Sequence, residues 1–255
     1  MPPLKTDAVV IKTFDFRETS IIATLYTRDF GKINAILKGI RGFPEKFAST
    51  LEPFSHNQIV FYKSRNSGLH LVSQCDLHEN FASLRADITK ITLASLMMEL
   101  VDAVMPLEEV NQDVFNLSVD CLNAMRDCIY ADKITTIFKI KLLILSGFKP
   151  HFDSCISCGE RIIGQGKFSI ELGGLICPAC FKKDLRARNI FRGTIATILY
   201  IEKCDLANNL RLGINPQIKR ELDSMLSAFI DFHIDKKIKS QNVLDSLKIG
   251  SLSVR

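Results

Sequence analysis

Short apolar runs alternate with turns over the first 76 residues of the chain. The runs are rich in β-branched and aromatic side chains, which favour strands, and turn residues such as Asp29, Gly31 and Gly68 separate them. Strands are therefore predicted at Ala8–Ile11, Ser20–Tyr26, Lys32–Leu37, Gln58–Tyr62 and Leu69–Val72. A longer connection, residues 39–56, lies between the third strand and the fourth.

From about residue 80 the apolar residues recur at steps of three and four, which is the period of an amphipathic helix. Helices are therefore predicted from Leu84 to Met105, from Val114 to Cys128, from Ile137 to Leu145, and at about residues 190–203 and 216–233. Gly147 ends the third, while Asn215 is a suitable N-cap and Pro216 a suitable first residue for the last.

Together these elements predict an α+β protein. Five short strands with one long connection fit an OB-fold barrel, and an SH3-like barrel fits the same count nearly as well. The helices predict a bundle into which a small zinc-ribbon module is inserted before the last helices. We expect four segments: an OB-fold domain at 1–78, the first part of the helical domain at 79–152, the zinc ribbon at 153–184 and the C-terminal helices at 185–255.

Half of the eight cysteines stand as two Cys-x-x-Cys pairs. Cys155 and Cys158 are followed, after eighteen residues, by Cys177 and Cys180. Two intervening residues let both thiolates of a pair face one ion, and the spacing between the pairs is typical of zinc ribbons. A short hairpin around Gly173 would bring the second pair to the first. We therefore expect one structural zinc ion as the cofactor.

Other chemistry for these cysteines is less favoured. A redox dithiol pair and an iron–sulfur site are the alternatives, and a catalytic zinc would need an open position that four thiolates do not leave. His151 is expected to lie beside the site or on the surface and not to be a ligand. The remaining cysteines are expected to be reduced and buried; they are Cys75, Cys121, Cys128 and Cys204.

No sequence motif indicates catalysis. The chain contains no P-loop, no His-Glu-x-x-His and no Gly-x-Ser-x-Gly, and its histidines are scattered.

The N-terminus reaches the charge of Lys5 before any apolar run, and no stretch approaches the roughly 20 apolar residues of a membrane span. We therefore expect a soluble intracellular protein that binds partners and is not an enzyme.

Charge is unevenly distributed along the chain. Residues 1–75 carry 10 lysines and arginines against 6 aspartates and glutamates, residues 155–255 carry 16 against 10, and residues 76–154 carry 7 against 12. Two basic ends and an acidic middle indicate an anionic partner at the ends.

Basic residues near the predicted barrel turns and just after the cysteines are candidates for binding nucleic-acid phosphates. They are Lys12, Arg17, Arg28, Lys32, Lys38, Arg41, Lys46, Lys63, Arg65, Lys182, Lys183 and Arg186. Phe14, Phe16, Phe43 and Tyr62 could stack on bases. An ordinary solvated rim explains the barrel cations equally well.

The order of these features resembles the RecO family of bacterial DNA repair and recombination mediators. In the first half the matching segments are Ala8–Val10, Asp15 with Glu18–Ser20, Tyr26–Thr27, Phe30–Lys32, Lys38–Arg41 and Leu51–Phe54. In the second half they are Gly147–Pro150, the two cysteine pairs with Gly159, Phe168–Ser169, Gly173–Gly174, and Phe232–His233 with Lys237 and Lys239–Ser240. The resemblance covers nearly the whole chain.

This resemblance implies a function. A RecO-like protein would bind single- and double-stranded DNA with its OB barrel, anneal complementary strands and, with RecR, help to load RecA onto DNA coated by single-stranded-DNA-binding protein. It would be cytoplasmic and nucleoid-associated. It would also capture the acidic tail of single-stranded-DNA-binding protein, for which Lys133, Lys139 and Lys141 are the candidate cations in the acidic middle. The alternatives are an RNA-binding or translation-associated module and a zinc-dependent nucleic-acid enzyme.

Overall fold

The computed structural model describes residues 2–42, 47, 51–65, 67–162, 166–241, 243, 244 and 246. The chain forms two compact units: one comprises Met1–Thr135 and Ile238–Arg255, the other Thr136–Lys237. The boundary falls within helix α4 (Ala131–Leu145). The α+β class is confirmed, and the four-segment division stays a prediction.

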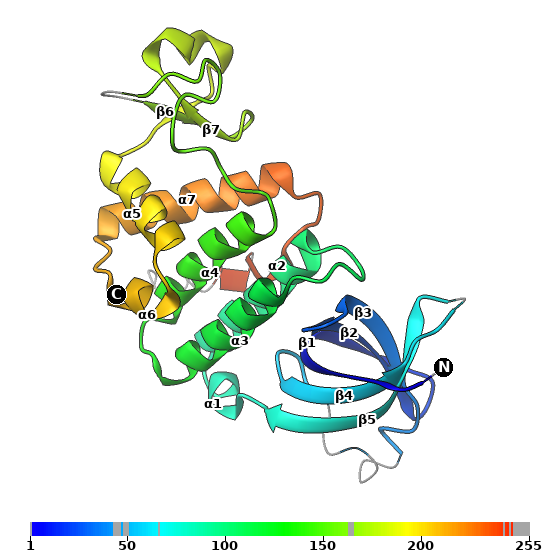
Figure 1. Cartoon of the computed structure of the whole chain (residues 1–255). Coiled ribbons are helices and arrows are strands. Elements are labelled where there is room, and N and C mark those ends of the chain that lie inside the picture. Colours follow the sequence, from blue (N-terminus) through cyan, green and yellow to red (C-terminus); the bar gives the residue numbers. More distant parts are fainter. Residues whose placement is uncertain are drawn as a thin grey trace. The chain divides into compact units, whose positions relative to one another are not determined.

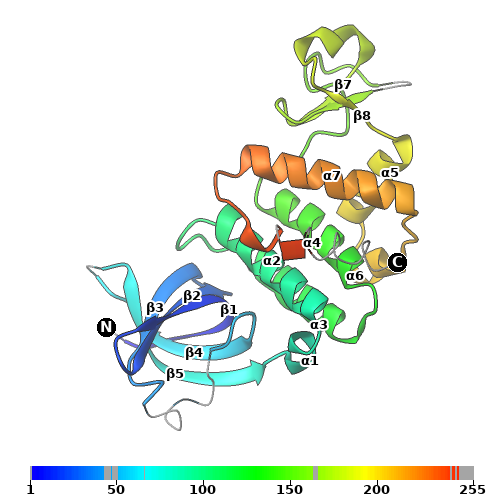
Figure 2. The same ribbon diagram turned by 180° about the vertical axis from the view of Figure 1, so that it is seen from behind.

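The first unit begins with a closed five-stranded barrel (Figures 1 and 2). Its strands are β1 (Leu4–Phe16), β2 (Ser20–Thr27), β3 (Gly31–Leu37), β4 (His56–Tyr62) and β5 (Leu69–Glu79). They join in the order β1-β2-β3-β5-β4, and β1 pairs with β4 to close the barrel. Every pairing is antiparallel except that of β3 with β5. This order is that of an OB fold, so the predicted architecture is confirmed.

Closure of the barrel depends on the long first strand. β1 pairs with β4 from Leu4 to Val9 and with β2 from Ala8 to Phe16, so it serves both neighbours. A register shift between Val10 and Lys12 marks a bulge, which bends a strand and increases its twist. The backbone of Val10 also exchanges hydrogen bonds with Phe54 and Ser55, just before β4 begins.

Inward-facing aliphatic and aromatic side chains fill the barrel. Leu25, Ala35 and Ile59 are completely buried there. The connection between β3 and β4 also contributes, since Ile40 and Leu51 belong to the same core. Burying this apolar surface is the main favourable term in the stability of the barrel.

The first helix after the barrel differs from the prediction. Instead of one helix from Leu84, the structure has α1 (Ala82–Arg85) and α2 (Ile88–Val104). Asp87 separates them, because its backbone is extended and its carboxylate accepts the N–H groups of Thr89 and Lys90 as an N-cap. α3 (Gln112–Asp127) follows as predicted, capped by Asn111.

The segment between α2 and α3, residues 105–111, packs backbone to backbone on the barrel. The Glu108 N–H donates to the Lys32 carbonyl at 2.8 Å, and Leu107 forms a bridge with Lys32. Gly31 has φ of +64°, and a Cβ there would lie 2.1 Å from the carbonyl oxygen of Glu109. Glycine is therefore required for this approach.

The second unit contains a three-stranded sheet and helices (Figure 1). Its elements are β6 (Lys167–Ser169), β7 (Gly174–Ile176), the 3-10 helix η2 (Pro178–Lys183), β8 (Arg188–Asn189), α5 (Arg192–Lys203), α6 (Leu206–Arg211) and α7 (Pro216–His233). The predicted β6–β7 hairpin, α5 and α7 are confirmed, and Asn215 caps α7 as predicted. β8 and α6 were not predicted.

The four cysteines outside the pairs are free thiols of two kinds. Cys75 and Cys121 are buried, as expected. Cys128 and Cys204 are only half-buried, because each follows the last residue of a helix, α3 and α5 respectively.

Candidate metal centre and nucleic-acid interface

The first cysteine pair lies on a tight turn. The Gly159 N–H donates to the Cys155 carbonyl at 2.8 Å, and the Cys155 N–H donates to the Glu160 carbonyl at 2.8 Å. Gly159 has φ of +77°, a conformation that glycine adopts without strain. The turn therefore orients Cys155 and Cys158 in a common direction, as the spacing predicted.

The second pair follows the β6–β7 hairpin. Cys177 is the N-cap of η2, Pro178 occupies the first turn, and the Cys180 N–H donates to the Cys177 carbonyl at 2.9 Å. A hydrogen bond of 2.8 Å from the Ile156 N–H to the Leu175 carbonyl joins the first turn to β7. These bonds bring the two pairs together within residues 153–189, here called the cysteine module.

All four sulfur atoms lie within 4.8 Å of one another, and those of Cys158 and Cys177 are 3.7 Å apart. A tetrahedral ion with metal–sulfur bonds of about 2.3 Å requires sulfur atoms about 3.8 Å apart, so the cluster fits a four-coordinate metal ion. Cys155, Cys177 and Cys180 are buried, while Cys158 is exposed. The candidate ligand set from the sequence is thus brought together in space.

Backbone N–H groups favour a thiolate at Cys155. Burial alone raises the pKa of this thiol, but hydrogen bonds from the backbone of Cys177, Cys158 and Ser157 outweigh burial and lower the pKa to about 6. The Cys177 N–H lies 3.3 Å from the Cys155 sulfur. A thiolate is the form that binds a metal, so the local backbone assists binding.

His151 does not join the cluster. Its Nε2 lies 2.8 Å from the Ser154 hydroxyl oxygen, and the cluster of possible metal ligands found in the described part of the chain contains only the four cysteines. Near the cluster, Lys182, Lys183 and Arg186 are exposed.

The predicted barrel cations fall into two groups, and the first group is paired with carboxylates. Lys12 and Lys32 both contact Asp102 of α2, at 2.7 and 3.3 Å. Lys32 is only 8% exposed, so the structure places it in the interior and not on a phosphate-binding surface. Arg41 contacts Asp15 at 2.6 Å and also donates to the carbonyls of Arg17 and Glu18.

The second group is exposed and, among the residues that the structure describes, has no carboxylate partner. It comprises Arg17, Arg28, Lys38 and Arg65. Lys46 and Phe43 lie outside the described residues. Of the aromatic candidates, Phe14 is 57% and Tyr62 39% exposed. The Arg17 guanidinium lies 5.2 Å from the centre of the Phe16 ring, so this ring is partly covered by a cation.

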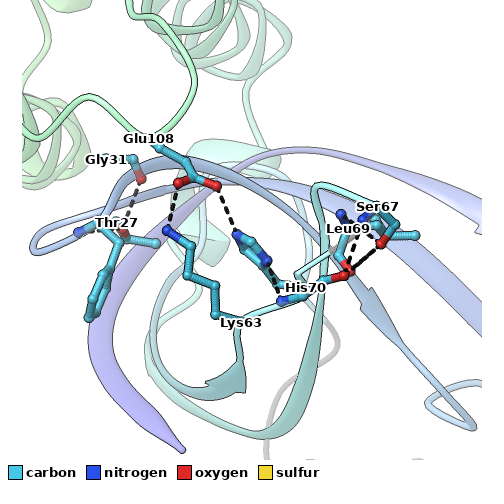
Figure 3. Close-up of polar contacts among 9 residues, drawn as sticks. Thr27, Gly31, Lys63, Ser67, Leu69, His70 and Glu108 are labelled. Carbon is cyan, nitrogen blue, oxygen red and sulfur yellow. Dashed lines mark hydrogen bonds and ion pairs between the residues drawn. The ribbon is translucent and has the colours of Figure 1, made fainter. Parts of the chain in front are cut away.

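Glu108 pairs with the remaining predicted cation (Figure 3). Its carboxylate lies 2.6 Å from the Lys63 ammonium and 3.5 Å from Nε2 of the buried His70. The Lys63 hydrogen bond holds the pKa of Glu108 below its ordinary value. Burial lowers the pKa of His70, and Glu108 opposes that effect in part.

Asp102 and Glu108 were not among the residues predicted to lie at the barrel cations. Both lie in the acidic middle of the chain, 90 residues from Lys12 and 45 residues from Lys63 respectively. The only signal in the sequence is the charge imbalance between the basic first segment and the acidic second one. No local spacing connects these partners, because the packing of the helices on the barrel brings them together.

The candidate peptide-binding lysines on α4 are constrained by the fold. Lys139 is only 7% exposed. Lys141 donates to the carbonyls of Glu202 and Cys204 at 2.9 and 2.7 Å, and burial lowers its pKa. Lys133, in the first turn of α4, is half-buried. Their role in binding a partner stays a prediction.

Fold and site together define an OB-barrel protein with a four-cysteine metal-ligand cluster. The family model described as recombination protein O N terminal matches residues 1–81, and the model described as recombination protein O C terminal matches residues 85–242. The chain therefore belongs to the RecO family of DNA repair proteins. The RecO resemblance noted from the motifs is confirmed.

Curated relatives agree over nearly the full length. The chain is 32% identical over 234 residues to DNA repair protein RecO of Alkaliphilus metalliredigens, covering 91% of this chain and 94% of that protein. It is 30% identical over 248 residues to DNA repair protein RecO of Syntrophus aciditrophicus, covering 96% of each chain. Among the described residues, no helix is long and apolar enough to cross a membrane.

Proposed function

We propose that this protein is a recombination mediator that binds single- and double-stranded DNA and anneals complementary strands, with no catalytic activity of its own. With RecR it would help to load RecA onto DNA coated by single-stranded-DNA-binding protein, in the bacterial cytoplasm at the nucleoid. The observation that carries the proposal is an OB barrel, in a chain of the RecO family, with four exposed cations for which the described residues offer no carboxylate partner. These cations are Arg17, Arg28, Lys38 and Arg65.

The chemistry of the barrel supports binding without catalysis. Cations attract the backbone phosphates of a nucleic acid whatever its base sequence, and each contact releases counterions from the nucleic acid. Exposed Phe14 and Tyr62 offer faces on which bases can stack. Annealing needs no covalent bond to be made or broken in the DNA, so it requires no catalytic group.

The proposed metal is one structural zinc ion bound by Cys155, Cys158, Cys177 and Cys180. Four thiolates would complete its coordination, which leaves no position for a reacting water. Zinc would cross-link the two Cys-x-x-Cys turns. The residues themselves orient the sulfurs through the Cys155–Glu160 and Ile156–Leu175 backbone bonds. Metal analysis of the purified protein is expected to give one zinc per chain, and an iron–sulfur absorbance would contradict it.

Strand annealing tests the mediator function. Complementary strands coated with single-stranded-DNA-binding protein are expected to pair faster when the protein is added, and a nuclease control is expected to show no cleavage. Competition with RNA of the same sequence tests the class of nucleic acid, since stronger binding of RNA would favour a translation-associated module. No acceleration of annealing would contradict the proposal.

A double variant tests the place of the interface. Lys38→Ala with Arg65→Ala removes two exposed cations for which no carboxylate partner lies among the described residues. We expect weaker DNA binding and a salt slope reduced by about 0.7 per lost contact on single strands. Lys5→Ala is a matched control, because Lys5 is exposed on β1 and outside the proposed set. Unchanged binding would move the interface to Lys182, Lys183 and Arg186.

Capture of the tail of single-stranded-DNA-binding protein stays part of the proposal. Changes at Lys139 or Lys141 would disturb buried contacts of α4, so Lys133→Glu is the suitable variant. Titration of a fluorescent tail peptide is expected to show weaker binding to this variant than to the wild type. Equal binding would exclude Lys133, and no binding to the wild type would contradict tail capture.

A further inference from the structure

Two donors at the connection between β4 and β5 converge on one carboxylate. Figure 3 shows Glu108 facing Lys63 on one side and His70 on the other. The Lys63 ammonium lies 2.6 Å from Glu108 Oε2, and His70 Nε2 lies 3.5 Å from Oε1. His70 Nδ1 accepts the Ser64 N–H at 3.2 Å, so a neutral His70 carries its proton on Nε2. That proton faces the carboxylate.

The barrel core holds His70 in position to donate its Nε2 proton to an anion. The side chain is 2% exposed, lies on β5 and packs against the ring of Phe61 with 5.6 Å between ring centres. Its position is therefore fixed by the barrel core, not by Glu108. Lys63, in contrast, is 45% exposed and can follow a ligand. A buried donor and an exposed cation beside it can together bind an anion.

Glu108 is anchored through its backbone and not through its side chain. The residue has φ of +60°, which is a strained conformation for a residue other than glycine. The hydrogen bond to the Lys32 carbonyl and the close approach at Gly31 hold it there. The carboxylate itself is 46% exposed, so it can rotate into solvent while the main chain stays in place.

We propose that the Glu108 carboxylate occupies a phosphate site formed by Lys63 and His70, and that a backbone phosphate of DNA displaces it on binding. This inference rests on the proposed function. A phosphate oxygen accepts hydrogen bonds from the same donors as a carboxylate oxygen, and Lys63 serves either as a point charge. Exposed Arg65, two residues from Lys63, adds a further cation for the entering strand. Glu108 thus lowers the affinity of the barrel for DNA.

The test compares two glutamates that are neighbours in the chain. Glu108→Gln keeps the size of the side chain and removes the competing charge. Glu109→Gln removes the same charge from an exposed residue that pairs with neither Lys63 nor His70 in the described structure. A fluorescent single-stranded oligonucleotide is titrated into each variant at several salt concentrations, and urea unfolding verifies that both variants are folded.

Glu108→Gln is expected to tighten binding about two- to fivefold at low ionic strength, the range that an exposed ion pair provides, with a smaller gain as salt rises. Glu109→Gln is expected to fall short of this gain. Lys63→Ala is expected to weaken binding and to abolish the gain, so that the Lys63→Ala, Glu108→Gln double variant binds like Lys63→Ala alone.

Equal affinities for the two glutamine variants would overturn the phosphate-site inference, and so would a gain that persists without Lys63. Either result leaves the mediator function standing if the wild type binds and anneals DNA. If neither the wild type nor any variant binds the oligonucleotide, both the inference and the proposed function fail.

Discussion

The barrel and the cysteine module achieve order by different means. The barrel encloses a continuous apolar core that includes Leu25, Ile33 and Ile59, and every strand pairs on both sides. Around the candidate metal site, the buried cluster that the structure describes is small: it comprises Cys155, Ile176, Cys177, Cys180 and Ala187, and three of these are candidate ligands themselves. A segment with so little apolar surface to bury depends on a cross-link, whereas the barrel can fold on hydrophobic burial alone.

Removal of the metal should give the largest effect and tests this contrast directly. Cys177→Ser is expected to lose the ion and to unfold the cysteine module, since structural zinc contributes roughly 10 kcal/mol or more to the folding of small metal modules. The barrel should stay folded. Metal analysis and near-ultraviolet circular dichroism measure the two outcomes.

Cys128→Ser is the control for that variant. Cys128 lies outside the cluster, and a serine there could still accept the Tyr130 N–H that now contacts the sulfur. It is expected to keep the ion. If Cys177→Ser kept a full complement of metal and a folded module, the contrast between the two regions would be wrong.

A cavity in the barrel should give the next largest effect. In contrast to Cys177→Ser, it should destabilise the barrel and leave the metal content unchanged. Leu25→Ala removes a completely buried side chain and is expected to cost about 2–5 kcal/mol of unfolding free energy. Because the candidate metal ligands lie in the other unit, the metal content of the folded protein should not change. Urea unfolding followed by metal analysis measures both quantities.

Leu77→Ala provides the matched control on β5, because Leu77 is 40% exposed. It is expected to cost less than about 1 kcal/mol, as surface substitutions usually do. Comparable losses for both leucines would show that the barrel core does not dominate the stability of its unit.

Gly31, which the 105–111 segment contacts, tests how the stability of the first unit depends on a single close backbone contact. Gly31→Ala places a Cβ 2.1 Å from the Glu109 carbonyl oxygen, and its backbone has positive φ. We expect a loss of about 1–3 kcal/mol in urea unfolding. Gly68→Ala separates the two causes, because Gly68 has φ of +59° and nothing within 4 Å of the added Cβ. An equal loss at both positions would attribute the effect to φ alone.

The pairing of Glu108 with Lys63 should contribute least. Its pKa is lower in the folded protein than the ordinary value of 4.5, so its stabilising contribution is complete above that pH and is lost as the pH falls through the folded pKa. We expect the wild type to exceed Glu108→Gln by about 0.2–1 kcal/mol at pH 7, and the difference to vanish in acid. Urea unfolding at a series of pH values measures it, and a difference independent of pH would exclude the carboxylate charge as its source.

The local features of this molecule could be predicted from the sequence. The strands are short runs rich in β-branched and aromatic residues between turns, Asn215 and Pro216 mark the start of α7, and the two Cys-x-x-Cys turns determine where the sulfurs converge. Each of these signals arises within a few residues of the chain. The strand count predicted a five-stranded barrel, but the pairing of β1 with β4 that closes it was not predicted.

The partners of the cations could not be predicted in this way. Lys32 has the same local pattern as an exposed strand-end lysine, yet the packing of α2 on the barrel buries it beside Asp102. β8 is only two residues long, and its pairing with β6 depends on a connection that passes through η2. Short pairings and long-range ion pairs depend on tertiary packing, and no spacing in the sequence records them.

The closed barrel determines how another protein can approach this region. Each of the five strands pairs with two neighbours, so none is a free edge, although β3 and β5 pair only over Asn34–Ile36 and Leu69–Leu71. The sheet of the cysteine module, in contrast, has two edges, and β8 is an exposed one. A protein that binds the barrel is therefore expected to do so mainly through side chains and loops. Strand addition is thereby disfavoured at the barrel, while its exposed side chains stay accessible to a ligand.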